Sequence, residues 1–321
     1  MMANLAELII NPGFVYSVIR VTTPILFATL AAMVTQRAGV TNIAIEGTML
    51  FAALFGVLGS AFFNSVLAGI FFAILIALII SGVLAYFTLI LDADNTLTCI
   101  ALNLLASGAT IFILFMITGD RLMSASLSSL IVPTWDLPVI QNIPVLGEMI
   151  SGHFSLTYIG FLMVIAVHIL LFKMPLGLRI RSVGENPDAA ASVGISVKKT
   201  RFIALMLGAV LAGLGGAFMS MGYMSMFTRD MVAGRGFIAL AASNVGGQAP
   251  IGGMFAALLF GFFDALANNL QLFRVPAELV QTVPYIATII LLCVSSYKKL
   301  KKAKPKGKSD TTSAKESSAK R

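Results

Sequence analysis

Residues 177–201 read GLRIRSVGENPDAAASVGISVKKTR and form the one long polar island in an otherwise apolar chain. A short helix is predicted inside this island, because Asn186 suits an N-cap, Pro187 the first helical position, and Gly194 the C-terminal end. A helix of about two turns is too short to be stable alone in water. We therefore expect it to pack against something else.

The composition around the island is that of a membrane protein. Hydrophobic residues make up 58% of the 321 residues, and charged residues only 11%, against about 25% in soluble domains. Apolar runs long enough to cross a bilayer recur along the chain. They lie near residues 13–35, 42–62, 65–91, 96–118, 155–173, 201–222, 235–247, 252–272 and 281–297. The sequence thus predicts an all-α, polytopic transmembrane helical bundle of eight to ten passes.

The charge distribution divides the chain into two parts and sets its orientation. Residues 297–321 hold ten Lys or Arg and two acidic residues, whereas the signs balance over residues 1–296. Residues 1–296 are predicted to form a transmembrane domain, and residues 297–321 a basic, disordered tail. Because basic residues favour the cytoplasmic side, the island and the C-terminal tail are both expected there. Counting nine passes back from the tail puts residues 119–154 and the N-terminus outside the cell.

Two polar stretches within the apolar runs are candidate sites. In QRAGVTNIAIEG (residues 36–47), Asn42 and Glu46 are four apart and would share one face of a helix. An ionisable group in a membrane is by default a candidate site. Glu46 could equally sit at a helix end, bonded to backbone N–H groups or to Arg37, and the sequence leaves both explanations open.

The second stretch is RGFIALAASNVGGQAPIGG (residues 235–253), in which glycines and Pro250 interrupt an apolar run. A broken or re-entrant segment is tolerated at membrane depth where it is buried in protein or lines a watery cavity, and Asn244 and Gln248 would offer hydrogen bonds there. A close helix crossing through small residues explains the glycines equally well. Asn103, within the fourth run, is expected to make an interhelical hydrogen bond.

No motif for covalent or metal chemistry occurs in the sequence. Gly307-Lys308-Ser309 matches the end of a nucleotide-binding loop, but Lys302 stands where that loop needs its first glycine. The positive charge lies in the tail and does not indicate a nucleic-acid surface. We expect neither an enzyme nor a cofactor bound by this chain.

Taken together and in this order, residues 36–47, 177–201 and 235–253 resemble the membrane permeases of ABC importers of the ribose/branched-chain amino-acid class. The first stretch, and LPVIQNIPVLGEMI at residues 137–150, are most similar to the nucleoside-type branch. The resemblance covers roughly residues 15–295. It implies that the transmembrane domain, residues 1–296, forms half of a translocation pathway, with nucleosides as the expected solute.

The resemblance also implies a set of partners in the plasma membrane. These are a cytoplasmic ABC ATPase that uses the ATP, a second permease subunit that differs from this chain and so makes a heterodimer, and an extracellular solute-binding protein or lipoprotein. The predicted short helix corresponds to the coupling helix that docks on the ATPase; its candidate residues are Glu185, Asn186, Pro187, Asp188, Ala189, Ala190 and Gly194. The candidate pathway residues are Asn42, Glu46, Asn103, Asn244 and Gln248.

Two alternatives remain at this stage. Within the same class, the solute could be a simple sugar such as ribose, or a branched-chain amino acid. From another class, an ion-coupled secondary transporter would favour inverted repeats and paired intramembrane carboxylates. The sequence shows no convincing repeat, and Glu46 and Asp264 are its only deep carboxylates.

Overall fold

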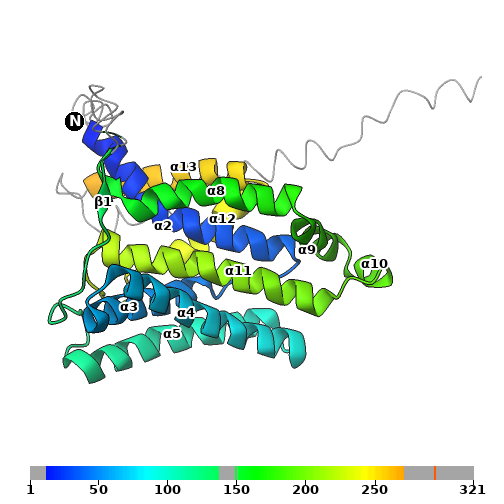
Figure 1. Ribbon diagram of the computed structural model, residues 1–321, viewed down its shortest axis with the longest axis horizontal. Helices are drawn as coiled ribbons and strands as arrows, with labels where there is room; N and C mark the ends of the chain where they lie inside the picture. Colours follow the sequence, from blue (N-terminus) through cyan, green and yellow to red (C-terminus); the bar gives the residue numbers. More distant parts are fainter. Residues whose placement is uncertain (1–11, 137–148, 150, 271–292, 294–321) are drawn as a thin grey trace, which may run out of the picture.

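The computed structural model describes residues 12–136, 149, 151–270 and 293, and these are mostly helical (Figure 1). The helices are α2 (Pro12–Arg37), α3 (Ile45–Phe63), α4 (Val66–Ala85), α5 (Asn95–Thr118), α8 (Ser155–Lys173), α9 (Pro175–Glu185), α10 (Pro187–Ser192), α11 (Val197–Phe218), α12 (Arg235–Val245) and α13 (Pro250–Leu270). Two π-helical turns, η1 (Tyr86–Ile90) and η2 (Met219–Tyr223), continue α4 and α11. Strands β1 (Thr134–Trp135) and β2 (His153–Phe154) pair antiparallel. The predicted all-α bundle is confirmed.

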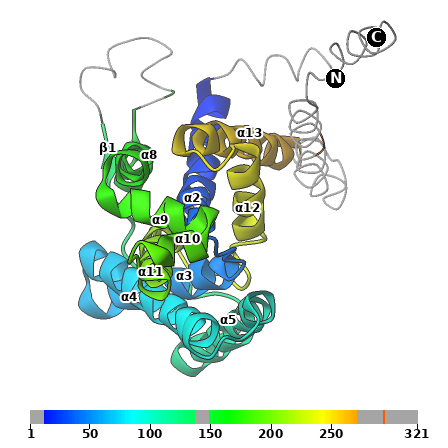
Figure 2. The same ribbon diagram turned by 90° about the vertical axis from the view of Figure 1, so that its right-hand side faces the viewer.

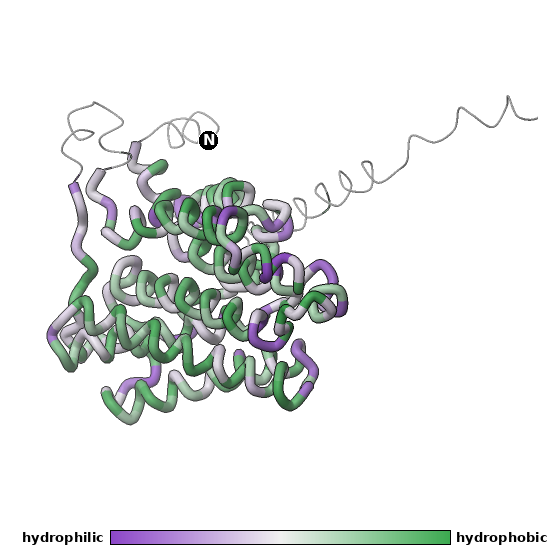
Figure 3. Tube along the Cα trace, turned by 45° about the vertical axis from the view of Figure 1, so that its right-hand side comes forward, coloured by the Kyte–Doolittle hydropathy of each residue, from purple (hydrophilic) through white to green (hydrophobic). Residues whose placement is uncertain are grey.

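Seven helical segments in the described part of the chain are long and apolar enough to span a membrane. They match seven of the nine predicted runs, and hydrophilic residues gather mainly at the ends of the helices (Figure 3). The seventh run, residues 235–247, corresponds to the short α12. The ninth, residues 281–297, lies outside the described residues apart from Cys293. The total of eight to ten passes, the domain limit at residue 296 and the disordered tail therefore stay predictions.

The two ends of the bundle are distinguished by the helices and contacts that they carry. One end, here called the α10 end, carries α9 and α10 (Figures 1 and 2). There Lys198 pairs with Asp92 at 3.6 Å, and the Arg201 Nε donates to the carbonyl of Ala38 at 3.3 Å. At the other end, here called the far end, the Tyr16 hydroxyl donates to the carbonyl of Gly152 at 3.0 Å. Within the described residues the first six spans alternate in direction between these ends. The next span, α13, runs the same way as α11, because α12 and the segment before it bring the chain back to the α10 end.

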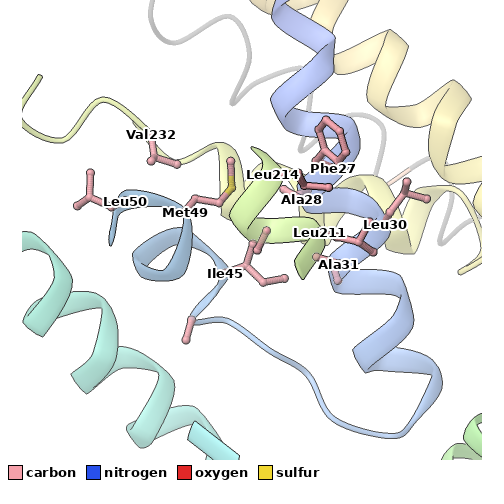
Figure 4. Close-up of a cluster of buried hydrophobic side chains, with 14 of the residues drawn as sticks. Phe27, Ala28, Leu30, Ala31, Ile45, Met49, Leu50, Leu211, Leu214 and Val232 are labelled. Carbon is pink, nitrogen blue, oxygen red and sulfur yellow. The ribbon is translucent and has the colours of Figure 1, made fainter. Parts of the chain in front are cut away.

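The core lies where α2, α3 and α11 meet. Side chains from all three helices, among them Phe27, Met49 and Leu214, pack together in Figure 4. Gly216 of α11 lies against the backbone of α3, where even a methyl group would collide with the carbonyl oxygen of Met49. Small residues allow such close helix packing in a bilayer, where burial of apolar surface supplies little driving force. By contrast, α4 and α5 expose most of their surface.

The polar island folds into two helices, of which only one was expected. The predicted short helix is α10, and the side chain of Asn186 accepts from the backbone N–H of Ala189 at 3.0 Å, as expected of an N-cap. Gly194 has φ +83°, which suits glycine just after a helix. The eleven-residue α9 before it was not predicted. Its alternation of apolar and basic residues gives a narrow apolar stripe, buried through Gly177, Ile180 and Val183.

Candidate functional site

Helix α12 is too short to cross a membrane. Its 11 residues measure about 16 Å at 1.5 Å per residue, roughly half of a 30 Å hydrocarbon layer. Its C-terminal end lies at the α10 end, where the Arg37 Nε donates to the carbonyl of Gln248 at 2.8 Å. Its N-terminal end therefore lies within the membrane, so the break in this span comes before α12 and not at the glycines and Pro250 where it was expected. The first backbone N–H groups of such a helix need acceptors.

Glu46 supplies those acceptors from α3. The two oxygens of its carboxylate accept from the backbone N–H groups of Gly234, at 2.8 Å, and Gly236, at 2.7 Å. A carboxylate at a helix N-terminus is stabilised by the helix dipole. Gly236 makes this approach possible, because a Cβ atom there would lie 2.8 Å from Oε2 of Glu46 and 2.7 Å from its backbone nitrogen. The sequence left two explanations for Glu46, a site in the pathway or a helix end bonded to backbone N–H groups or to Arg37. The contacts match the helix-end explanation, and the N–H groups belong to the start of α12.

Asn103 of α5 and Asn42 hold the start of α3. The side-chain oxygen of Asn103 accepts from the N–H of Gly47 at 2.8 Å, and its amide nitrogen donates to the carbonyl of Ile43 at 3.1 Å. This confirms the expected interhelical bond. The expectation that Asn42 and Glu46 share a helical face is wrong, because α3 begins only at Ile45. Asn42 lies in the turn before it, buried, and accepts from the N–H of Ala44 at 3.0 Å.

A buried ion pair joins α12 to α13. Arg235, at the first position of α12, contacts Asp264 at 3.1 Å, and only 12% and 16% of these side chains are exposed. The guanidinium groups of Arg235 and Arg20 both lie over the ring of Tyr223, at 5.6 and 5.3 Å from its centroid. Removing one member of a buried pair leaves an uncompensated charge, which is strongly destabilising. This pair therefore fixes how α12 sits against α13.

A second polar contact lies on an exposed face of the chain. The Ser107 hydroxyl, at the middle of α5, donates to Asp230 at 3.0 Å. About half of the Asp230 side chain is exposed, and its neighbour Arg229 is exposed to a similar extent. Charged groups at membrane depth rarely face lipid and usually face protein or a water-filled cavity. The face that carries Ser107, Arg229 and Asp230, between α5 and the segment leading into α12, is here called the α5–α12 face. It is therefore the strongest candidate for a polar pathway.

The remaining predicted pathway residues lie elsewhere. Asn244 is exposed near the C-terminal end of α12, nine residues after Arg235, or about 13 Å further along the helix axis. Gln248 lies in the turn to α13 with φ +53°, and its N–H donates to the carbonyl of Ser243 at 2.9 Å. The structure thus brings Asn42, Glu46 and Asn103 together around the start of α3 and leaves Asn244 and Gln248 at the α10 end.

The glycines of this turn serve close packing. A Cβ at Gly246 or Gly252 would collide with the other helix of the α12–α13 pair, and one at Gly253 would collide with Met33. Of the two explanations kept open for these glycines, the structure supports the close helix crossing at the α10 end. The broken geometry that needs polar partners occurs instead at the start of α12.

The predicted coupling residues lie together on the surface of the α10 end. Glu185, Asn186, Asp188, Ala189 and Gly194 are exposed, and Pro187 is half-buried. Ala190 differs, since only 3% of it is exposed and it packs against the chain itself. Val193 was not among the predicted coupling residues, but it belongs to the same surface, and 74% of it is exposed. An exposed apolar residue beside a short helix fits a surface that another protein covers.

Sequence reasoning missed the residues that join these helices over long distances. Ser107, Asp230 and Arg235 were not singled out, although TRDMVAGRG at residues 228–236 places three charges between two apolar runs. That density of charge within a membrane domain was the available signal. Within the described residues, no group of three metal-binding side chains occurs.

Comparison with known proteins gives a match over most of the chain. Residues 14–292 match the family model described as the branched-chain amino acid transport system permease component. The chain is 33% identical to the nucleoside ABC transporter permease protein NupC of Lactococcus lactis over 91% of this chain and 93% of NupC. It is 38% identical to the guanosine ABC transporter permease protein NupQ of Bacillus subtilis over 84% of this chain and 87% of NupQ.

A third relative carries a different solute in its name. TsgC13 of Haloferax volcanii, an ABC transporter permease provisionally ascribed to glucose, is 28% identical over 87% of this chain and 90% of its own length. No solved structure matches the chain.

Proposed function

The chain belongs to the branched-chain amino acid transport system permease family, and on that premise we propose that it forms half of the pathway of an ATP-driven nucleoside importer. As a permease component it is a transport subunit and not an enzyme. Membership also removes the reason to consider an ion-coupled secondary transporter.

The observation that carries the nucleoside assignment is the similarity to NupC and NupQ over nearly the whole chain. These relatives are named for nucleoside and guanosine transport and are 33% and 38% identical to this chain. The relative ascribed to glucose is 28% identical, so a simple sugar is the second candidate solute. Branched-chain amino acids, which the family description names, are the third.

The pathway is proposed to run along the α5–α12 face. The support is the exposed Ser107–Asp230 pair at the middle of α5, since a neutral solute needs only a few polar groups in an otherwise apolar channel. Glu46, Asn103 and Asn42 act behind this face, where they hold the starts of α3 and α12 in position. Asn244 and Gln248 offer hydrogen-bonding groups at the α10 end of the pathway.

The partners follow from the same assignment. A cytoplasmic ABC ATPase docks on α10 and hydrolyses the ATP, so this chain needs no cofactor of its own. A second, different permease completes the pathway as a heterodimer, and an extracellular binding protein or lipoprotein delivers the solute. In this arrangement the α10 end and the C-terminal tail lie in the cytoplasm and the far end lies outside the plasma membrane, as the distribution of basic residues favours.

The test is uptake of labelled guanosine, ribose, glucose and leucine in a strain that lacks this gene, with and without a plasmid copy. Restored uptake of guanosine, inhibited by other unlabelled nucleosides and not by the sugars or leucine, is the expected result. Restored uptake of a sugar or of leucine alone would reject the nucleoside assignment while leaving the permease family intact.

A further inference from the structure

A cavity of about 360 Å³ opens at the α10 end between α4, η1 and α11. Gly82, Ala85 and Leu89 line one side and Phe202 the other, so that its walls are almost entirely apolar. Lys198 and Lys199 lie on its rim. None of these residues belongs to the α5–α12 face or to the predicted coupling surface.

The π-helical turn η1 helps to shape this space. It replaces the last regular turn of α4, and the N–H of Leu91 bonds five residues back to the carbonyl of Tyr86 at 3.2 Å. A π turn widens a helix locally and is frequent at functional sites. At Gly82, one turn earlier, an added Cβ would meet nothing within 4 Å. This helix therefore leaves a hollow where a regular helix with a side chain would fill it.

The rim of the cavity is positively charged. The N-terminal end of α11 carries two lysines and no acidic residue in its first turn, although the helix dipole disfavours cations there. Asp92 lies 3.6 Å from Lys198, but both side chains are largely exposed, so this pair contributes little. Within the described part of the chain Lys199 makes no ion pair. Two cations beside a helix N-terminus favour an anion at this position.

The surroundings of the cavity match a membrane boundary. Tyr86, Ile90 and Phe202 expose large apolar surfaces beside it, whereas Lys198 and Asp92 form an exposed ion pair at 3.6 Å. A ligand here meets apolar walls in the membrane and cations at its edge. A phospholipid has this arrangement, with acyl chains below and a phosphate at the level of the lysines.

We propose that this cavity binds one anionic phospholipid, with part of an acyl chain against Gly82 and Leu89 and the headgroup phosphate between Lys198 and Lys199. The charge of the rim selects an anionic headgroup over a zwitterionic one. The site stands apart from solute transport and does not depend on which solute the permease carries.

The test is native mass spectrometry of the purified, delipidated protein titrated with phosphatidylglycerol or phosphatidylcholine of the same acyl chains. One phosphatidylglycerol should bind more tightly than further copies and more tightly than phosphatidylcholine. Replacing Lys198 and Lys199 together with Gln should weaken that first binding by more than tenfold, because a lysine near an anionic lipid contributes about fivefold. Lys173→Gln, which removes an exposed lysine at the same end, should leave it unchanged.

The cavity itself is tested by filling it. Gly82→Leu places a side chain in open space and should abolish the preferential binding without lowering thermal stability. Gly108→Leu is its matched control, because an added Cβ at Gly108 of α5 also meets nothing within 4 Å. Asp92→Asn should strengthen binding, since it releases Lys198 and removes a negative charge from the rim.

A fluorescent reporter locates the bound lipid. The chain has one tryptophan, Trp135, in β1, so Trp135→Phe with Phe202→Trp puts a single indole at the cavity. Brominated phosphatidylglycerol should quench it more strongly than brominated phosphatidylcholine. Equal quenching by both lipids, or binding insensitive to the Lys198/Lys199 and Gly82 changes, would overturn the proposal. The proposal would also be overturned if Gly82→Leu still bound the lipid but no longer assembled with the second permease. That result would mean that a protein, and not a lipid, covers the cavity.

Discussion

Glu46 links two helices through hydrogen bonds to backbone rather than to another side chain. Its carboxylate holds the N–H groups of Gly234 and Gly236, while Asn103 holds the turn of α3 that carries it. Four residues from three helices thus fix the point where α12 begins inside the membrane. Changes to these side chains should act on the position of α12 and through it on the pathway.

We predict that Glu46→Gln impairs transport less than Glu46→Ala at matched protein levels. Gln keeps one acceptor oxygen, whereas Ala leaves both N–H groups without a partner, at a cost of about 1–3 kcal/mol each. Gly236→Ala should resemble Glu46→Ala, because its methyl group would displace the carboxylate. Solute uptake and thermal unfolding in detergent measure both effects. Wild-type transport in all three variants would show that this junction has no role in the pathway.

His153, at the far end, should make stability depend on pH. Burial is the main cause that lowers its pKa, opposed by its contact with the carbonyl of Met149, while Arg20 lowers the pKa further. The folded state therefore binds fewer protons than the unfolded state, and stability rises with pH. This contribution is complete above the unfolded pKa of about 6.5 and is lost as pH falls below it.

The measurement is the thermal midpoint of the wild type and of His153→Phe between pH 5 and pH 8. Phe keeps a flat ring against Tyr16, whose ring is stacked on that of His153 at 4.1 Å, but cannot take up a proton. The difference between the two proteins should therefore change across this range, with the wild type losing stability faster towards acid. Parallel profiles would exclude His153 as the titrating group.

At the scale of single elements, α10 has one face packed against the chain and one face exposed to solvent. Ala189 and Val193 point to solvent and Ala190 is buried. We predict that Ala189→Glu with Val193→Glu blocks docking of the ATPase while the permease still inserts and stays stable. Ala190→Glu should instead lower the amount of folded protein, because it buries a charge. Normal coupling of ATP hydrolysis to transport in the first variant, correctly assembled, would refute the coupling role of α10.

The elements that could be predicted from sequence are those specified by nearby residues. Apolar runs gave seven spans, and Asn186, Pro187 and Gly194 gave α10, because length and capping are local properties. Helix α9 was missed because its basic residues hide a narrow apolar stripe. Glu46 was recognised as a candidate, yet its partners lie 188 and 190 residues away. No pattern of spacing reveals such a contact, since it depends on how whole helices pack.

At the scale of the whole molecule, the basic tail should be separable from transport. Residues 297–321 carry a net charge of +8 and few apolar residues, so they cannot form a core of their own. Ending the chain after Tyr297 should therefore leave uptake per permease molecule largely unchanged. Uptake is measured with permease quantified in membranes. Complete loss of uptake at normal abundance would assign the tail a specific role.

The last prediction distinguishes the faces of the bundle. Ser107 of α5 lies on the face proposed for the pathway, whereas Ile165, at the middle of α8, is an exposed apolar residue expected to face lipid. After the native Cys99 and Cys293 are replaced by Ala, Ser107→Cys should react with a water-soluble maleimide, because thiolates form only where water reaches. Ile165→Cys should not react, although it lies at a similar depth. Addition of the second permease should slow the labelling of Ser107→Cys and leave that of a far-end control, Arg121→Cys, unchanged. Equal labelling at positions 107 and 165 would mean that the α5–α12 face is an ordinary lipid-facing surface, and the pathway would have to be sought elsewhere.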